Sequence, residues 1–254
     1  MGINKLNHAR LAQLYAAVNH ILNIEEVANI LEMPKIVVAK LMSRWVEQGY
    51  FLRMKRGLYS PIKPDIKSSE SFNSWIIATK LYGPCYIGAL TAAEYWGLTN
   101  QKLPSTNVLS TQKLRNRNLT VNGIHFLVRT ISQQGMFGLE SIVHQHVEIL
   151  ISDPSRTIID FLIDPQLGGD IDNIIDLFNQ YLKSAHRNAD LLFSYAKKTL
   201  NGAVLKRLGY MLERCKSGEI NIIKLCYLLK TTGTIKLDAA MDGNKLITRW
   251  GLWV

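Results

Sequence analysis

Three cations lie within four residues in the segment GYFLRMKRGLYS, residues 49–60. Guanidinium and ammonium groups such as those of Arg53, Lys55 and Arg56 pair with phosphate oxygens, so this cluster favours a polyanionic partner. Apolar side chains alternate with the first two cations, as in a strand with one apolar and one cationic face. A second short apolar run follows Gly57. The spacing predicts a basic hairpin that turns at this glycine.

Segments with helical periodicity precede the hairpin. Apolar residues recur at three- and four-residue spacing over residues 7–21. Asn23 can cap a second helix, whose first turn is acidic, as the helix dipole favours. Pro34 suits the first turn of a third helix, and Gly49 ends that helix. The short connection between the second and third helices predicts a helix-turn-helix, and the hairpin that follows predicts a winged helix-turn-helix.

The third predicted helix has a basic outer arc. In a helix-turn-helix this helix enters the major groove of DNA, and its N-terminal residues meet base edges. We expect such contacts from Lys35, Ile36, Ala39 and Lys40. Arg44 is expected to meet a phosphate, and the hairpin cations are expected to reach the backbone or the minor groove. The predicted DNA-binding residues are therefore Lys35, Lys40, Arg44, Arg53, Lys55 and Arg56. The alternative is a small helical domain with a solvated basic face.

Bulk composition agrees with a folded, basic protein. The chain has 254 residues, of which 47% are hydrophobic and 20% charged, and its length favours two domains. The net charge of +10 divides into +5 for residues 1–67, −1 for residues 68–170 and +6 for residues 171–254. A basic protein attracts nucleic acid or an anionic membrane surface. The two basic ends fit either a two-part DNA contact or two solvated helical faces.

The spacing of the cysteines and the lengths of the apolar runs indicate the cellular compartment in which we expect the protein. The three cysteines have neither zinc-site nor CxxC spacing, which favours a reducing environment. The first residues have no signal-peptide pattern, and no apolar run approaches the roughly 18 residues that span a bilayer. We expect a soluble, cytoplasmic protein with no membrane partner.

A polar, proline-containing stretch over residues 60–69 is the best linker candidate. It divides a winged helix at residues 1–62 from a larger domain at residues 68–254. In the larger domain the predicted strands are 85–87, 106–110, 124–129 and 147–151. The predicted helices are 70–82, 90–96, 154–163, 171–183, 188–199, 201–216 and 219–230. The fold class is α+β, with a mixed α/β domain that becomes mainly helical toward the C-terminus. The last 22 residues are expected to form an extended tail that packs back on the body.

The sequence DPSRTIID is the sharpest pattern outside the basic hairpin. Asp153 and Asp160 could act as metal ligands or as an acid and a base, which would suit a metal-dependent nuclease or nucleotidyltransferase. The alternative is the start of a helix, in which Asp153 is the cap, Pro154 takes the first position and Arg156 pairs with Asp160 four residues on. We favour the helix start.

Other constellations each leave two interpretations open. His144, His146 and Glu148 are zinc-compatible residue types that could share one strand face, or they could lie on an exposed strand edge. Two sets of cations could bind nucleic acid or another protein, or could be solvated surface. They are Lys113, Arg115 and Arg117 in the middle of the chain, and Lys197, Lys198, Lys206 and Arg207 nearer its end. No phosphate loop, nucleophile elbow or HExxH helix is present. We expect no enzymatic activity, no metal and no cofactor.

Five motifs in order resemble the AbiEi antitoxins of prokaryotic type IV toxin–antitoxin and abortive infection systems. They are RMKRGLY at residues 53–59, YIGALTAAEYWGL at 86–98, DPSRTIIDFL at 153–162, NGAVLKRLGYMLE at 201–213, and a terminal pattern with Leu237, Asp238, Gly243, Arg249 and Trp250. The resemblance covers nearly the whole chain. It departs from the family at Asp238, where proline is expected, and at the final valine, where asparagine is frequent. Neither departure affects the predicted DNA-binding part.

The resemblance implies two activities. The N-terminal winged helix would repress the operon of the protein by binding double-stranded DNA at repeated sites in its own promoter. The larger domain would counteract a nucleotidyltransferase toxin, and direct contact with that toxin is not required in such systems. The sequence leaves the oligomeric state open, one arrangement being a monomer that binds cooperatively on DNA.

Overall fold

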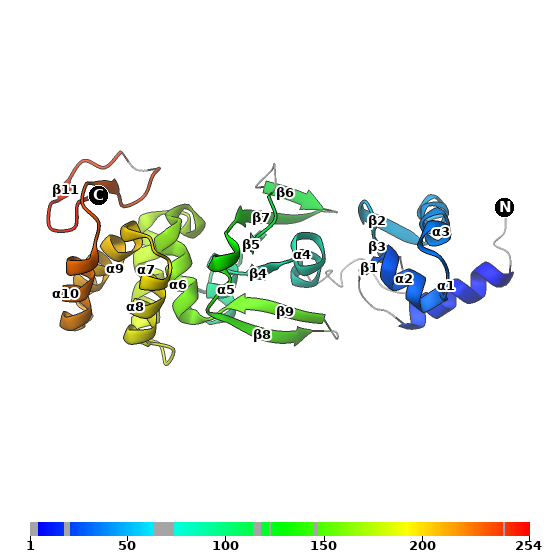
Figure 1. Ribbon diagram of the computed structural model, residues 1–254, viewed down its shortest axis with the longest axis horizontal. Coiled ribbons are helices and arrows are strands. Elements are labelled where there is room, and N and C mark those ends of the chain that lie inside the picture. Colours follow the sequence, from blue (N-terminus) through cyan, green and yellow to red (C-terminus); the bar gives the residue numbers. More distant parts are fainter. Residues whose placement is uncertain are drawn as a thin grey trace.

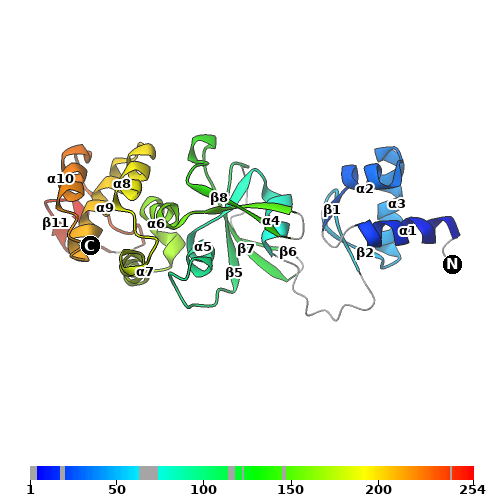
Figure 2. The same cartoon turned by 90° about the horizontal axis from the view of Figure 1, so that it is seen from below.

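The computed structural model describes residues 5–17, 21–62, 74–113, 118–121, 123–144, 147–240 and 242–254. Figure 1 shows three parts in a row along the long axis, namely a small unit with α1–α3, a six-stranded sheet in the middle, and a helical region at the C-terminal end. The perpendicular view in Figure 2 shows the same order. The protein is of mixed α/β class.

The described part of the N-terminal unit combines helices with a three-stranded sheet. The helices are α1 (Lys5–Ala17), α2 (Ile24–Leu31) and α3 (Lys35–Glu47). The strands are β1 (Leu22–Asn23), β2 (Phe51–Lys55) and β3 (Leu58–Pro61), in the order β1-β3-β2. Both strand pairs are antiparallel. Buried side chains of all three helices and of the sheet form one apolar core, in which Trp45 of α3 lies against Phe51 of β2.

Local signals explain the helix ends of this unit. Asn23 and Glu26 form a capping box, in which each side chain accepts a backbone N–H of the other residue at 2.8 Å. Glu32 adopts a left-handed backbone with φ 52° after α2, and Pro34 caps α3. The predicted second and third helices are confirmed. The first was predicted too long, because Ile21 lies outside α1 and is buried; residues 18–20 lie outside the described residues.

The middle of the chain builds a six-stranded sheet in the order β6-β7-β5-β4-β9-β8. Its strands are β4 (Cys85–Ile87), β5 (Ser105–Ser110), β6 (Asn118–Val121), β7 (Ile124–Thr130), β8 (Leu139–His144) and β9 (Val147–Ser152). The pairs β4–β9 and β5–β7 are parallel, and the other pairs are antiparallel. Helices α4 (Ser74–Tyr82) and α5 (Ala89–Tyr95) pack against it.

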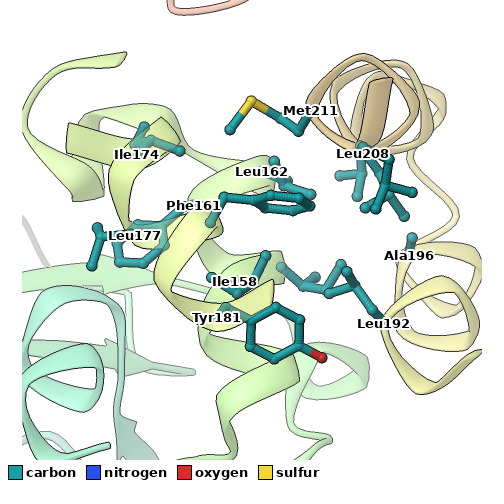
Figure 3. Packing of buried hydrophobic residues seen from close by; sticks show 14 of the residues in the cluster. Ile158, Phe161, Leu162, Ile174, Leu177, Tyr181, Leu192, Ala196, Leu208 and Met211 are labelled. Carbon is teal, nitrogen blue, oxygen red and sulfur yellow. The ribbon is translucent and has the colours of Figure 1, made fainter. Parts of the chain in front are cut away.

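The C-terminal region is helical, as predicted. Its helices are α6 (Pro154–Ile163), α7 (Ile171–Lys183), α8 (Ala189–Lys198), α9 (Gly202–Arg214) and α10 (Ile220–Leu229). Two short 3-10 helices, η1 (Gln133–Gly135) and η2 (Pro165–Gly168), lie in connections. Figure 3 shows side chains of α6, α7, α8 and α9 meeting in one apolar core, with Phe161 and Leu162 of α6 at its centre.

The end of the chain packs back on this region, as expected. Strands β10 (Ile235–Lys236), β11 (Leu246–Ile247) and β12 (Leu252–Trp253) form a small sheet in the order β10-β12-β11. Trp250 is fully buried against Gly209 of α9, where a Cβ would overlap its ring. Arg207 of α9 donates hydrogen bonds to the carbonyls of Leu162 and Leu237, both at 2.9 Å. This arginine therefore fastens the tail to α6.

One face of the N-terminal sheet packs against the middle of the chain. Met54 and Leu58 lie in one buried cluster with Ile76 and Ile77 of α4. Glu26 of α2 forms an ion pair with Lys80 of α4 across the same junction. The sheet is therefore covered on both faces, by its own helices and by α4.

Two differences from the sequence-based expectation concern boundaries and strands. The linker was predicted from Ser60, but Ser60 and Pro61 belong to β3, and residues 63–73 lie outside the described residues. Strands β1, β6 and β8 and the short strands β10, β11 and β12 of the tail were not predicted. The helices that the structure describes are all too short or too polar to cross a bilayer.

Candidate nucleic-acid interface

Helix α3 presents a polar outer face. Val38, Leu41, Met42 and Trp45 point into the core and are buried. A shallow depression on the opposite side is lined by Ala39, Lys40, Ser43, Arg44 and Glu47. Because this periodicity separates the two faces, the predicted contacts Lys40 and Arg44 lie on the exposed one.

The hairpin β2–β3 carries its cations outward. Arg53, Lys55 and Arg56 are all exposed, and Gly57 makes the turn with φ 79°. Arg53 lies directly opposite Tyr59 in the strand register, and Tyr59 belongs to the core formed with the helices. Directly opposite residues share a sheet face, so Arg53 lies on the face that looks toward the helices.

Stacking of two aromatic rings packs strand β2 of the hairpin against α3. The rings of Trp45 and Phe51 are stacked, with centroids 5.9 Å apart and planes inclined by 24°. Phe51 and Arg53 are two residues apart in one strand and therefore point to the same side. Arg53 and the α3 cations thus lie on one side of the sheet, whereas Lys55 pairs with Leu58 beyond an irregularity in β2 and lies on the side that α4 covers.

Ion pairing separates Lys35 from the other predicted contacts. Its ammonium lies 2.9 Å from a carboxylate oxygen of Glu25 on α2. Within the described ranges, no carboxylate pairs with Lys40, Arg44, Arg53, Lys55 or Arg56. The Lys35–Glu25 pair could not be predicted from the sequence, because it depends on the angle between α2 and α3. Lys35 is therefore a weaker candidate for a DNA contact than the other five.

The two aspartates of DPSRTIID hold structure together, which confirms the helix-start interpretation. Asp153 caps α6 by accepting the Arg156 N–H at 2.7 Å, and its other oxygen accepts the Tyr195 hydroxyl at 2.8 Å. Asp160 pairs with Arg156 at 3.0 Å and accepts the Tyr86 hydroxyl at 2.9 Å. Burial raises the pKa of Asp160, and the Arg156 guanidinium opposes that rise.

The predicted zinc-compatible residues do not share one strand face. His144 ends β8 opposite Val147, and Glu148 lies in β9 opposite Val143, so His144 and Glu148 point to opposite faces. Glu148 accepts a hydrogen bond from Ser141 at 2.7 Å. His146 lies outside the described residues. Among the residues with a described position, no group of three His, Cys, Asp or Glu side chains could hold a metal ion.

The remaining predicted cations fall into two kinds. Lys206 is buried and donates to the carbonyl of Gly233 at 2.7 Å, and Arg207 fastens the tail, so neither fits either of the two interpretations left open, a basic binding face or solvated helix surface. Burial lowers the pKa of both side chains. Lys113, Lys197 and Lys198 are exposed. Arg115 and Arg117 lie outside the described residues.

Comparison with known proteins adds no assignment. No family model matches this chain, and no curated protein matches it.

Proposed function

We propose that the protein is a DNA-binding transcriptional repressor. The observation that carries the proposal is the unit formed by α3 and the β2–β3 hairpin, in which five of the six exposed cations have no carboxylate partner among the described residues. Phosphate groups supply the missing anionic partners, and a duplex presents them in a regular array.

Element order and strand order support a winged helix-turn-helix over residues 1–62. Helices α2 and α3 are joined by a short turn at Glu32, Met33 and Pro34, and a hairpin follows α3 directly. The sheet order β1-β3-β2 places the strand after the first helix beside the hairpin. In this arrangement α3 enters the major groove and the hairpin reaches the backbone or the minor groove.

The second half of the proposal is an antitoxin role for residues 68–254. It rests on the resemblance to the AbiEi antitoxins, with a nucleotidyltransferase toxin as the functional partner. Three of the resembling motifs meet in one core of this structure. Tyr86, Asp160 and Leu208 belong to separate motifs, and the first two share a hydrogen bond of 2.9 Å. The residues of these motifs named here are buried and stabilise the larger domain. They do not indicate where on its surface an antitoxin site would lie.

A mobility-shift assay on the DNA directly upstream of the coding sequence tests the repressor proposal. We expect a shifted complex that resists unlabelled non-specific DNA and weakens steeply as salt rises. Binding no tighter to that segment than to random duplex would refute it. The antitoxin role is tested separately, by co-expression with a nucleotidyltransferase toxin of a type IV system encoded beside this protein, where we expect relief of growth arrest; the lack of any such gene beside it would count against the role. Growth arrest that persists would remove that role and leave the DNA-binding proposal standing.

A further inference from the structure

The first turn of α3 carries a large apolar side chain that is mostly exposed to solvent. Ile36 is 76% exposed, more than any other large apolar residue of the described N-terminal unit. Its helix buries Val38, Leu41, Met42 and Trp45 on the opposite side, so the core has no place for Ile36. An isoleucine so exposed contributes little to the stability of the folded chain.

The neighbours of Ile36 place it on the surface proposed to meet DNA. Residues three, four and seven positions apart share one helix face, so Ile36 lies in a row with Ala39, Lys40 and Ser43. Ala39, Lys40 and Ser43 line the depression on the outer face of α3. Lys35 beside it is held by Glu25 at 2.9 Å. Because Lys35 is paired with Glu25, the side chain that this first turn offers to a ligand is the apolar one of Ile36.

The major groove offers one apolar feature, the C5 methyl group of thymine. Polar base edges lose hydrogen bonds to water when an isoleucine covers them, whereas a methyl group gains from being covered. We propose that Ile36 reads a thymine methyl group in the bound DNA. This inference rests on the proposed DNA-binding function and assigns Ile36 as a residue that determines sequence preference.

Replacing thymine by deoxyuridine tests the contact, because it removes only the methyl group. In the upstream segment that the protein binds, each thymine is replaced in turn and affinity is measured by fluorescence anisotropy. For the wild type we expect one thymine per bound site whose replacement weakens binding about fourfold, the factor that one buried methyl group contributes.

The variant Ile36→Ala should abolish the difference between thymine and deoxyuridine at that position while keeping the salt dependence of the wild type. Val143→Ala is the matched control, because Val143 is 74% exposed on the edge strand β8. It should keep the full effect of deoxyuridine.

Two results would overturn the inference while leaving the repressor proposal intact. One is wild-type binding that tolerates deoxyuridine at every position, and the other is an effect of deoxyuridine that persists in Ile36→Ala. Failure to bind the upstream DNA at all would remove both proposals. The thymine contact and the DNA-binding function therefore fail in distinguishable ways.

Discussion

The guanidinium of Arg156 lies 3.0 Å from the carboxylate of Asp160, and both side chains are closed off from solvent. The Tyr86 hydroxyl joins them, donating to Asp160 at 2.9 Å and accepting from Arg156 at 2.8 Å. The Phe137 ring lies 4.1 Å from the guanidinium carbon and covers it. This cluster connects β4 of the sheet to α6 of the helical region.

Removing one partner of this pair should destabilise the fold strongly. In Asp160→Ala the Arg156 charge stays buried without compensation, and such a change costs about 3–5 kcal/mol. Urea unfolding followed by circular dichroism measures it. The control is Lys102→Ala, which breaks an exposed pair with Glu94 and should change stability by less than about 1 kcal/mol. Equal stabilities for the two variants would contradict the structural role of the cluster.

Gly209→Ala should destabilise the protein although alanine favours helices. The added methyl group would overlap the Trp250 ring, and overpacking of this kind costs about 1–3 kcal/mol, against a helical gain of about 0.5–1 kcal/mol. In a Trp250→Leu background the overlap is relieved and the same substitution should become neutral or stabilising. Thermal unfolding of the wild type, the two single variants and the double variant measures this reversal of sign. Its absence would show that α9 and the tail are packed differently.

Stability should fall in alkaline solution because of buried thiols. Burial raises the pKa of Cys85 and of Cys226 to about 12, from a usual value of 9.0. Between these values the unfolded chain releases thiol protons that the folded chain keeps, so the free energy of unfolding decreases as pH rises from about 9 toward 12. Tyr82 and Tyr195, each raised to about 12, add to the decrease.

A pH series of urea titrations measures this decrease. The double variant Cys85→Ala, Cys226→Ala should show a shallower slope above about pH 9. Alkylation of the native protein provides an independent reading, in which half-buried Cys215 should react before the two buried thiols. A slope that is unchanged in the double variant would mean that the thiols ionise freely.

Arg56→Ala should weaken binding to all duplexes alike. Arg56 is exposed at the turn of the hairpin and has no carboxylate partner among the described residues, so its expected contact is a phosphate. Loss of one phosphate contact should lower the slope of log affinity against log salt by about 1. A salt titration measures the slope, with Lys102→Ala as the matched removal of a distant exposed cation. A wild-type slope in Arg56→Ala would exclude a phosphate contact by Arg56 and would count against a place for the hairpin in the interface.

Lys35 and Lys40 should differ in their contributions. Lys35→Ala is expected to reduce DNA affinity less than Lys40→Ala does, because the Lys35 ammonium is shared with Glu25 at 2.9 Å. Glu25→Gln should tighten binding by freeing Lys35 and removing a negative charge, with an increase of about 0.9 in the salt slope if one phosphate is gained. Glu140→Gln, on β8, is the control for loss of an exposed acid. Equal effects of the two lysine substitutions would show that the pair opens on DNA.

Local signals predicted the helices well. Asn23 and Asp153 were recognised as caps, and both accept the backbone N–H three residues on. Apolar periodicity located α7 to the residue, because its buried side chains recur at helical spacing, whereas α6 is buried on all sides and was located by its cap and by Pro154. The predicted alternation in β2 holds only in part: Met54 is buried and Arg53 is exposed, but an irregularity between Arg53 and Lys55 sets Lys55 opposite Leu58, so the two cations do not share one strand face.

What depends on distant contacts could not be predicted. Strand β1 has two residues and exists because Leu22 and Asn23 pair with β3. Strand β8 shows no apolar alternation, since it forms the edge of the sheet and is largely exposed. Lys206 looks like helix surface in the sequence, yet the tail closes over it through the carbonyl of Gly233. The pairing of Lys35 with Glu25 likewise follows from the helix crossing.

Helix α4 buries the apolar side chains of Met54 and Leu58. The stability of the N-terminal unit therefore depends on a helix that follows it in the chain. A fragment that ends at Ile62 would expose the apolar face of the β1–β3–β2 sheet to solvent and would tend to aggregate. A transfer of this N-terminal unit to another protein would therefore need to include α4.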